Sequence, residues 1–284
     1  MLRIRALVGE DFPAADDVLR AAFHAHVSFV PRLRRYLALQ PDSWLAAEDE
    51  GQVVGLVGAI DYGLFAYIGL MAVRPDRQGQ RLGRKLMDTL LGELDGRGRA
   101  CALLDATAAG APLYERSGFV DAGLSHEFSH GDEDAGGLAP SPDSGVSLAN
   151  ASDFDEIVAL DASFLGAPRE RLWRWLFATH PQRILAARDA THELCGYLCL
   201  QDPLLGPFGA REPQVADELL REGLKLLGHR NVRLQVPEEN AEGRALLAQA
   251  GFRETRTLRH MRRGPCPTLA GWRSIYGKGS YCLG

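Results

Sequence analysis

Residues 73–83 read Val-Arg-Pro-Asp-Arg-Gln-Gly-Gln-Arg-Leu-Gly, and residues 84–94 continue as Arg-Lys-Leu-Met-Asp-Thr-Leu-Leu-Gly-Glu-Leu. Leucine recurs at every fourth position from Leu82 to Leu94, which predicts an amphipathic helix over 82–95. The apolar run before the turn predicts a strand over 65–73. Strand, glycine-containing turn and helix in this order are typical of an α/β protein.

The charges at the start of this helix are reversed from the usual order. Four cations crowd it, and no acid occurs between Asp76 and Asp88; the cations are Arg77, Arg81, Arg84 and Lys85. Since a helix N-terminus is already partly positive, each misplaced cation costs a few tenths of a kcal/mol. A bound anion would reverse this cost, and Gly79 and Gly83 would let backbone amides turn toward it. We therefore predict an anion site at 78–83; the alternative is a solvated basic turn.

Length and composition favour a globular protein with two domains. The chain has 284 residues, of which 46% are hydrophobic and 24% charged, which suits two domains of roughly 130 residues. The net charge of −5 argues against nucleic acid as the main ligand. The charged N-terminus is unlike a signal peptide, and no apolar stretch is long enough to cross a membrane. We expect a cytoplasmic protein that binds neither nucleic acid nor membrane.

The cysteines do not predict a metal site or a disulfide framework. There are 5 of them, an odd number, and no CxxC pair occurs. We therefore expect no zinc site, no other metal and no disulfide framework.

The chain divides into two similar halves around a polar segment. Residues 129–145 are rich in Gly, Ser, Pro and Asp and predict a linker, between domains 1–128 and 146–284. Each half starts with a strand, an acidic or hydroxyl residue in the position of a helix cap, and a helix, which ends at Phe23 or Phe164. Each half ends with a short helix, a Gly-Phe pair and a strand. Such correspondence indicates an internal repeat.

The expected elements of the first half alternate between strands and helices. Helices are predicted at 12–23, 31–40, 82–95 and 110–116, and strands at 44–48, 52–60, 65–73, 100–106 and 120–128. In the second half, strands are predicted at 183–188, 194–200, 231–236 and 253–262. The fold class is α/β, with two domains that each carry a mixed, mostly antiparallel twisted sheet flanked by helices.

The order of these motifs resembles the GCN5-related N-acetyltransferase (GNAT) family. The resemblance covers most of 1–128 and rests on the strand, Val-Arg-Pro, Gln-Gly-Gln-Arg-Leu-Gly, the helix, and Pro-Leu-Tyr-Glu-Arg-Ser-Gly-Phe over 112–119. The family's turn motif is Q/R-x-x-G-x-G/A; Gln78 and Gly83 match it, while Arg81 stands where the central glycine would be. The second half resembles the degenerate C-terminal domain of tandem family members, through 206–210, 261–264 and 275–284.

The resemblance implies acetyl-CoA as co-substrate and assigns residues to it. The strand residues Met71, Ala72 and Val73 would pair with the pantetheine arm. The turn would hold the pyrophosphate, through Gln78, Gly79, Gln80, Arg81, Leu82, Gly83 and Arg84. Tyr114 occupies the family's general-acid position, where a phenol with a pKa of about 10 can protonate the leaving thiolate. The alternative for Tyr114 is an aromatic ring that packs the helix against the sheet.

The general base is not identified by the sequence. Asp61 at a strand end and the loop histidines His24 and His26 are candidates, and none is preferred. In the second half, the helix from Gln214 begins with acids, Asp217 and Glu218, and carries Lys225 later, which is the ordinary order of charges. Alignment of Phe252 with Phe119 places Leu247 opposite Tyr114. The sequence therefore predicts no second active site.

We expect an acyl-CoA N-acyltransferase that moves an acetyl group to a primary amine of a small molecule or peptide, with its chemistry in the first domain. The alternatives are a catalytically silent acetyl-CoA sensor and a structural protein without cofactor. The acceptor and the oligomeric state stay open, with a homodimer among the options.

Overall fold

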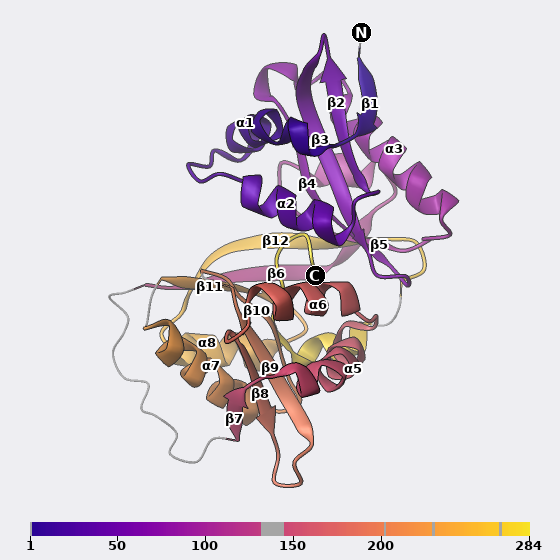
Figure 1. Ribbon diagram of the computed structural model, residues 1–284. Helices are drawn as coiled ribbons and strands as arrows, with labels where there is room; N and C mark the ends of the chain where they lie inside the picture. The colour runs from indigo at the N-terminus through magenta and orange to yellow at the C-terminus, as the bar shows by residue number, and fades with distance from the viewer. Residues whose placement is uncertain (1, 132–144, 202, 229–230, 267–268) are drawn as a thin grey trace. The chain divides into compact units, whose positions relative to one another are not determined.

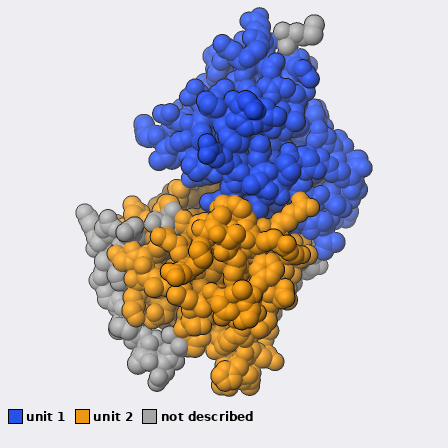
Figure 2. Space-filling view, viewed as in Figure 1, with its two compact units in different colours: residues 1–121, 261–266 blue, residues 122–260, 267–284 orange. Residues whose placement is uncertain are grey.

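The computed structural model describes residues 2–131, 145–201, 203–228, 231–266 and 269–284 (Figure 1). The chain forms two compact units, drawn in blue and orange in Figure 2. The N-terminal unit comprises residues 1–121 and 261–266, and the C-terminal unit comprises residues 122–260 and 267–284. Residues 132–144 of the predicted linker lie outside the described part of the chain.

The N-terminal unit is built on a mixed sheet in the order β1-β2-β3-β4-β5. Its strands are β1 (Arg3–Ala6), β2 (Trp44–Asp49), β3 (Gln52–Asp61), β4 (Ala66–Val73) and β5 (Ala102–Ala106). Strands β1 to β4 pair antiparallel, whereas β4 and β5 pair parallel. Each strand whose bounds were predicted is confirmed to within two residues at its ends, because a mostly apolar run bounded by polar or turn residues marks it in the sequence. Burial is continuous along most of β3 and alternates only along part of β4.

Helices cover both faces of this sheet (Figure 1). They are α1 (Phe12–Phe23), α2 (Val30–Leu39), α3 (Leu82–Gly96) and α4 (Ala111–Glu115). The leucine stripe of α3, with Tyr114 of α4, packs on one face in a buried cluster that contains no residue of α1 or α2. On the other face Tyr36 of α2 stacks on Trp44 at 5.2 Å between ring centroids. The periodicity that predicted these helices is therefore the periodicity of burial.

The C-terminal unit contains a second sheet, in the order β13-β10-β9-β8-β7, and the strand group β12-β6-β11. Its strands are β6 (Val120–His130, from residue 122 on), β7 (Val146–Leu148), β8 (Ile184–Arg188), β9 (Leu194–Leu200), β10 (Leu205–Ala210), β11 (Val232–Pro237), β12 (Arg253–Arg263, up to residue 260) and β13 (Ile275–Gly277). Its helices are α5 (Phe154–Leu165), α6 (Glu170–Thr179), α7 (Pro213–Leu227) and α8 (Ala241–Gln249). None of the described helices is long and apolar enough to cross a membrane.

Strands β6 and β12 are each divided between the two compact units. Strand β6 ends the first half, yet from Ala122 onward it belongs to the C-terminal unit, where it pairs with β11. Strand β12 is the last strand but one of the second half, and its residues from Met261 onward belong to the N-terminal unit, beside β5. The compact units therefore differ from the predicted domains 1–128 and 146–284 in these segments. Pairing between residues so distant in sequence leaves no local signal.

The exchanged segment 261–266 is fixed to the N-terminal unit in several ways. Met261 is fully buried in the core under α3. Arg263 binds both carboxylate oxygens of Asp95 at 2.8 Å, and this guanidinium lowers the pKa of Asp95. Cys266 forms a disulfide with Cys101. The expectation that the cysteines form no disulfide is therefore wrong for this pair, because the strand exchange brings together residues 165 positions apart.

Titration of thiols tests the disulfide directly. The denatured, unreduced chain is expected to react with a thiol reagent at the three free cysteines Cys195, Cys199 and Cys282, and at all 5 after reduction. The Cys266→Ser variant should lower the free energy of unfolding by about 2–4 kcal/mol, to the value of the reduced native sequence. Five reactive thiols before reduction would contradict the pairing.

The acidic residues before α1 and α5 do not cap those helices, contrary to the sequence-based prediction. Asp11 accepts from the Val8 backbone N–H at 3.0 Å and pairs with Arg5 at 2.6 Å. This charged hydrogen bond from Arg5 lowers the pKa of Asp11.

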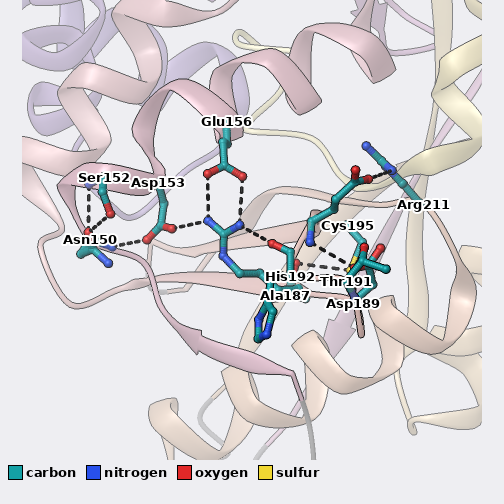
Figure 3. A network of polar contacts seen from close by, with 12 residues as sticks. Asn150, Ser152, Asp153, Glu156, Ala187, Asp189, Thr191, His192, Cys195 and Arg211 are labelled. Carbon is teal, nitrogen blue, oxygen red and sulfur yellow. Dashed lines mark hydrogen bonds and ion pairs between the residues drawn. The ribbon is translucent and has the colours of Figure 1, made fainter.

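The C-terminal unit repeats this arrangement around Asp153, which Figure 3 shows with Asn150 and Glu156. Asp153 accepts from the Asn150 N–H at 2.8 Å and pairs with Arg188 at 2.7 Å. Arg188 also binds Glu156 at 2.9 Å. In each half, an acid thus joins a short 3₁₀ turn to a strand arginine, although Arg5 lies on the first strand of its half and Arg188 on the second. The equivalent acids and turns support the predicted internal repeat.

The glycines that end the last short helix of each half are also equivalent. Gly118 and Gly251 have φ values of 86° and 84°, the left-handed conformation expected of a glycine after a helix. In each case the following Phe donates its N–H to a helix carbonyl: Phe119 to Tyr114 at 3.0 Å, and Phe252 to Leu247 at 2.9 Å. The alignment of Tyr114 with Leu247 is thereby confirmed by geometry.

Candidate active site

Strand β4 separates from β5 shortly after it begins. The two strands pair at Ala66 with Ala102 and at Tyr67 with Leu103. Beyond Tyr67, no described strand pairs with β4 on the β5 side. Part of the β4 edge is therefore left open within the sheet, where backbone groups need a hydrogen-bonding partner.

A bulge lies in β4 at this opening. The register with β3 shifts between Leu56 and Gly58, so that Leu70 and Met71 both stand opposite Val57. Leu70 takes a positive φ of 51°, which is uncommon for a branched side chain. Bulges re-aim backbone groups and recur beside active sites.

The alternation of backbone hydrogen bonds between β4 and β3 shows which backbone groups of β4 face the opening. The Arg74 N–H donates to the Val54 carbonyl at 2.9 Å, so Arg74 and, by alternation along an antiparallel pair, Ala72 direct their backbone groups toward β3. Val73, between them, directs its N–H and carbonyl away from β3. The Gln78 side chain donates to that carbonyl at 3.1 Å. Val73 thus offers a backbone donor, and Gln78 ties the following turn to the strand.

The turn 78–83 presents a group of backbone amides. Gly79 has φ 76° and Arg81 has φ 61°, and α3 begins at Leu82. Its first intrahelical bond runs from the Lys85 N–H to the Arg81 carbonyl. The N–H groups of residues 82–84 therefore have no acceptor within the helix, and no side chain caps it. Such a helix start is suited to bind an anion.

Only part of the predicted cation cluster is neutralised. Arg77 pairs with Asp49 at 2.9 Å, and Arg84 pairs with Asp88 at 2.8 Å. Arg81 and Lys85 are exposed and form no ion pair with any residue that the structure describes. Two cations thus stay available beside the uncapped amides, in the arrangement expected of a site for a phosphate-bearing ligand.

Tyr114 lies at the end of the same core. Its ring is 9% exposed and meets Phe119 edge-on at 6.1 Å between centroids. Gly110 lies close beneath, since a Cβ there would approach the Tyr114 ring to 3.3 Å. The ring therefore packs helix against sheet, as one interpretation of the sequence expected. Packing by the ring is compatible with a chemical role for the hydroxyl.

The candidate bases differ in how they are held. Asp61 binds Arg99 through both oxygens at 2.8 and 2.9 Å and accepts the Gly63 N–H at 2.8 Å. His24 and His26 are exposed in the segment between α1 and α2. Asp61 is thus engaged in an ion pair, and the histidines carry no contact that marks them for catalysis.

Sequence reasoning missed one polar pair at the opening between β4 and β5. The Tyr67 hydroxyl donates to Asp105 at 2.8 Å. Tyr67 is fully buried, whereas Asp105 is partly exposed. Asp105 is the charged residue in the otherwise apolar strand Ala-Leu-Leu-Asp-Ala, and an ionisable group in such a run was the signal available in the sequence. Among the described residues, no group of three or more His, Cys, Asp or Glu side chains could hold a metal.

In the C-terminal unit, the corresponding opening is filled by the chain itself. Strand β10 also carries a bulge, between Leu205 and Phe208, but its outer edge pairs with β13, with Phe208 opposite Gly277. Across the gap, the Lys278 N–H donates to the Gln235 carbonyl of β11 at 2.8 Å. A Cβ on Gly277 would lie 2.8 Å from the Leu205 carbonyl of β10 and 3.6 Å from Leu234 of β11. Strand β13 therefore occupies the slot between β10 and β11.

The start of α7 also differs from that of α3. Its first residue is Pro213, which has no N–H to offer an anion. Its acids Asp217 and Glu218 lie one turn further on than the sequence-based description of the helix start suggested. With Glu242 of α8 they line a groove of about 770 Å³ between the two helices. This unit combines a filled slot with an acidic groove.

The comparisons place the chain in a family. The acetyltransferase (GNAT) domain model matches residues 40–121, and a second acetyltransferase (GNAT) domain model matches residues 157–277. The chain therefore belongs to the GNAT acetyltransferases and contains two GNAT domains in tandem.

Several relatives and solved structures are similar to it. YitH of Bacillus subtilis (strain 168), an uncharacterized N-acetyltransferase, is 27% identical over 207 residues, 71% of each chain. A proposed acetyltransferase of Pyrococcus horikoshii is 23% identical with a TM-score of 0.87, over 100% of this chain and 96% of that one. A tandem GNAT protein from the clavulanic acid biosynthesis pathway is 18% identical with a TM-score of 0.66, over 94% and 100%. The two structures support the fold.

The left-handed Arg81 yields a prediction on stability. A glycine would occupy this conformation without strain, so Arg81→Gly is expected to raise the free energy of unfolding by about 1 kcal/mol. Arg81→Ala removes the same charge but keeps the strain, and should leave stability within about 0.5 kcal/mol of the native chain. Urea unfolding of both variants measures the difference. Equal stability of the two variants would contradict a strained Arg81.

Proposed function

We propose that the chain is an acyl-CoA N-acetyltransferase that transfers the acetyl group of acetyl-CoA to a primary amine of a small molecule or peptide. The N-terminal unit holds the thioester and performs the chemistry. The observation that carries this proposal is the contrast between the units: the N-terminal one combines an open strand edge with uncapped amides and free cations, whereas β13 fills the slot of the other.

The turn 78–83 and the start of α3 bind the pyrophosphate in this proposal. The amides of Leu82, Gly83 and Arg84 and the turn residues Gly79 and Gln80 donate to its oxygens, and Arg81 adds charge at short range. Gln78 holds the turn to Val73. Lys85 is exposed one turn into α3 and strengthens the positive potential there.

The open β4 edge takes the pantetheine arm, which is amide-rich and can pair as a strand does. Val73 offers its N–H, and Met71 lies in the bulge, where backbone groups are released from the ladder. Ala72 keeps the strand in place through its pairing with Leu56. Bound acetyl-CoA supplies an acetyl group activated as a thioester, and an amide aimed at its carbonyl oxygen stabilises the charge that develops there, an effect on the order of 3 kcal/mol.

Tyr114 acts as the general acid in this proposal. Departure of the thiolate requires a proton, and the hydroxyl of a tyrosine at the end of α4 can supply it. The buried ring, fixed against Phe119, holds the hydroxyl in one place. A catalytically silent acetyl-CoA-binding module would show the same packing of Tyr114. A measurement of turnover therefore distinguishes the transferase from the silent module.

Release of free thiol from acetyl-CoA with a panel of primary amines is the test. Tyr114→Phe is expected to lower kcat by about 10²-fold or more while the Kd for acetyl-CoA changes less than about twofold, because the ring and its packing are retained. Tyr276→Phe is the matched control, since Tyr276 lies in the core of the C-terminal unit, where burial raises its pKa to about 12. The kcat of the Tyr276→Phe variant should equal that of the native sequence.

Thiol release by Tyr114→Phe at the native rate would remove Tyr114 from the chemistry. Tight acetyl-CoA binding without thiol release across the whole panel would instead favour the sensor.

A further inference from the structure

The disulfide between Cys101 and Cys266 lies at the closed end of the opening between β4 and β5. Cys101 directly precedes β5, and its carbonyl accepts the N–H of Ala66, the first residue of β4, at 3.0 Å. The next residue, Ala102, pairs with Ala66, and the two strands separate after Tyr67. Cys101 therefore belongs to the short stretch that holds β5 to β4 before the proposed thioester site begins.

The loop that leads into β5 is held from two sides. On one side, Arg99 binds both oxygens of Asp61, the last residue of β3, at 2.8 and 2.9 Å. On the other side, segment 261–266 lies so close to the loop that a Cβ on Gly264 would clash with the Ala100 carbonyl oxygen. The φ value of Gly264 is 77°, which is a second reason for glycine there. The disulfide fixes this close contact covalently.

The two ends of segment 261–266 are held in different ways. Met261, at the first end, is fully buried in the core under α3. Nearer the last end, Arg263 pairs with Asp95, but their side chains are 26% and 46% exposed, and ion pairs at such exposure contribute little to stability. Opening of the disulfide is therefore expected to free the end at Cys266 while the end at Met261 stays in place.

The two sulfur atoms of the disulfide differ in accessibility. Cys101 is 1% exposed, whereas Cys266 is partly exposed. A thiolate of a small dithiol can therefore attack the Cys266 sulfur; the S–S bond breaks, and its electron pair goes to the Cys101 sulfur, which takes a proton. The second thiol of the dithiol then attacks the mixed disulfide and releases Cys266 as a thiolate, which also takes a proton. The dithiol supplies both electrons and ends as a disulfide, and exchange with an oxidised disulfide reverses the reaction.

We propose that the Cys101–Cys266 bond is a redox switch of the N-terminal unit. In the oxidised chain, segment 261–266 holds the start of β5, so that β4 and β5 separate at a fixed place. In the reduced chain, the loop 97–101 is less constrained, and a smaller fraction of molecules offers the β4 edge in the conformation that binds a ligand. The apparent affinity for acetyl-CoA falls in proportion to that fraction. The effect on affinity rests on the proposed function, whereas the opening of the bond and the loosening of the loop do not.

The first measurement is whether the bond opens in the folded chain. The native chain is incubated with dithiothreitol without denaturant, and its free thiols are then alkylated and located by peptide mass. We expect Cys266 to become alkylated because it is partly exposed. The free cysteines of the native chain are buried and should stay protected; they are Cys195, Cys199 and Cys282.

The second measurement is the response of the loop and of the ligand, after removal of the dithiol. Amide hydrogen exchange at Ala66 and in residues 97–101 should be about tenfold faster in the reduced chain than in the oxidised chain, with exchange in α7 unchanged. The Kd for acetyl-CoA, measured by calorimetry, should rise about fivefold or more on reduction.

Two variants complete the experiment. Cys266→Ser cannot form the bond, so its Kd should equal that of the reduced native chain and should not respond to dithiothreitol. Cys195→Ala removes a free, buried thiol from the core of the C-terminal unit and is the matched control. On reduction, the Kd of this control should rise by the same factor as that of the native chain.

The outcomes separate the switch from the proposed function. A bond that dithiothreitol opens only in denaturant would overturn the switch, as would a reduced chain whose Kd stays within about twofold of the oxidised one. A response of Cys266→Ser to dithiothreitol would assign the effect to another group and would overturn it equally. If neither form binds acetyl-CoA, the proposed function is wrong, and hydrogen exchange alone then decides whether reduction loosens the start of β5.

Discussion

The separation of two parallel strands is the constraint from which the rest of the structure follows. Once β4 leaves β5 after Tyr67, the backbone groups along its edge need another partner, because buried N–H and carbonyl groups cannot stay unpaired at low cost. The two units meet this demand differently. In the C-terminal unit the partner is β13, a strand of the same chain; in the N-terminal unit no described strand takes that place, and we propose a ligand there.

This difference explains how the two units can share one fold and still have different roles. Both units keep the bulged strand, the helix after it, and the short helix that ends at a Gly-Phe pair. The N-terminal unit has glycine and Arg81 just before α3 and Lys85 in its first turn, whereas the C-terminal unit has Pro213 at the first position of α7 and carboxylates one turn further on. The two units therefore differ in three features at once: whether a strand fills the opening, whether backbone amides are free at the helix start, and the sign of the charge there. This is expected if the N-terminal half kept a site for an anionic thioester and the C-terminal half lost it.

Sequence patterns predicted the local structure well because they record burial and backbone conformation. The leucine stripe gave α3, and Gly118 and Gly251 marked helix ends through their left-handed backbone. Three features could not be foreseen: the exchange of β6 and β12, the Cys101–Cys266 bond and the insertion of β13 between β10 and β11. Each joins residues distant in sequence, and β13 is too short to show a period. Of the candidate site, the turn 78–83 was visible in the sequence as reversed charge, whereas the open edge of β4 appeared only in the strand register.

We propose that one coenzyme A thioester binds per chain, at the open β4 edge and the start of α3 in the N-terminal unit. Calorimetric titration of the native chain with acetyl-CoA tests it most directly when repeated with Gly79→Val, which crowds a left-handed turn position with a branched side chain. We expect a stoichiometry of about one for the native chain and a loss of binding in the variant. Two thioesters per chain, or one that the variant binds as tightly as the native sequence, would contradict it.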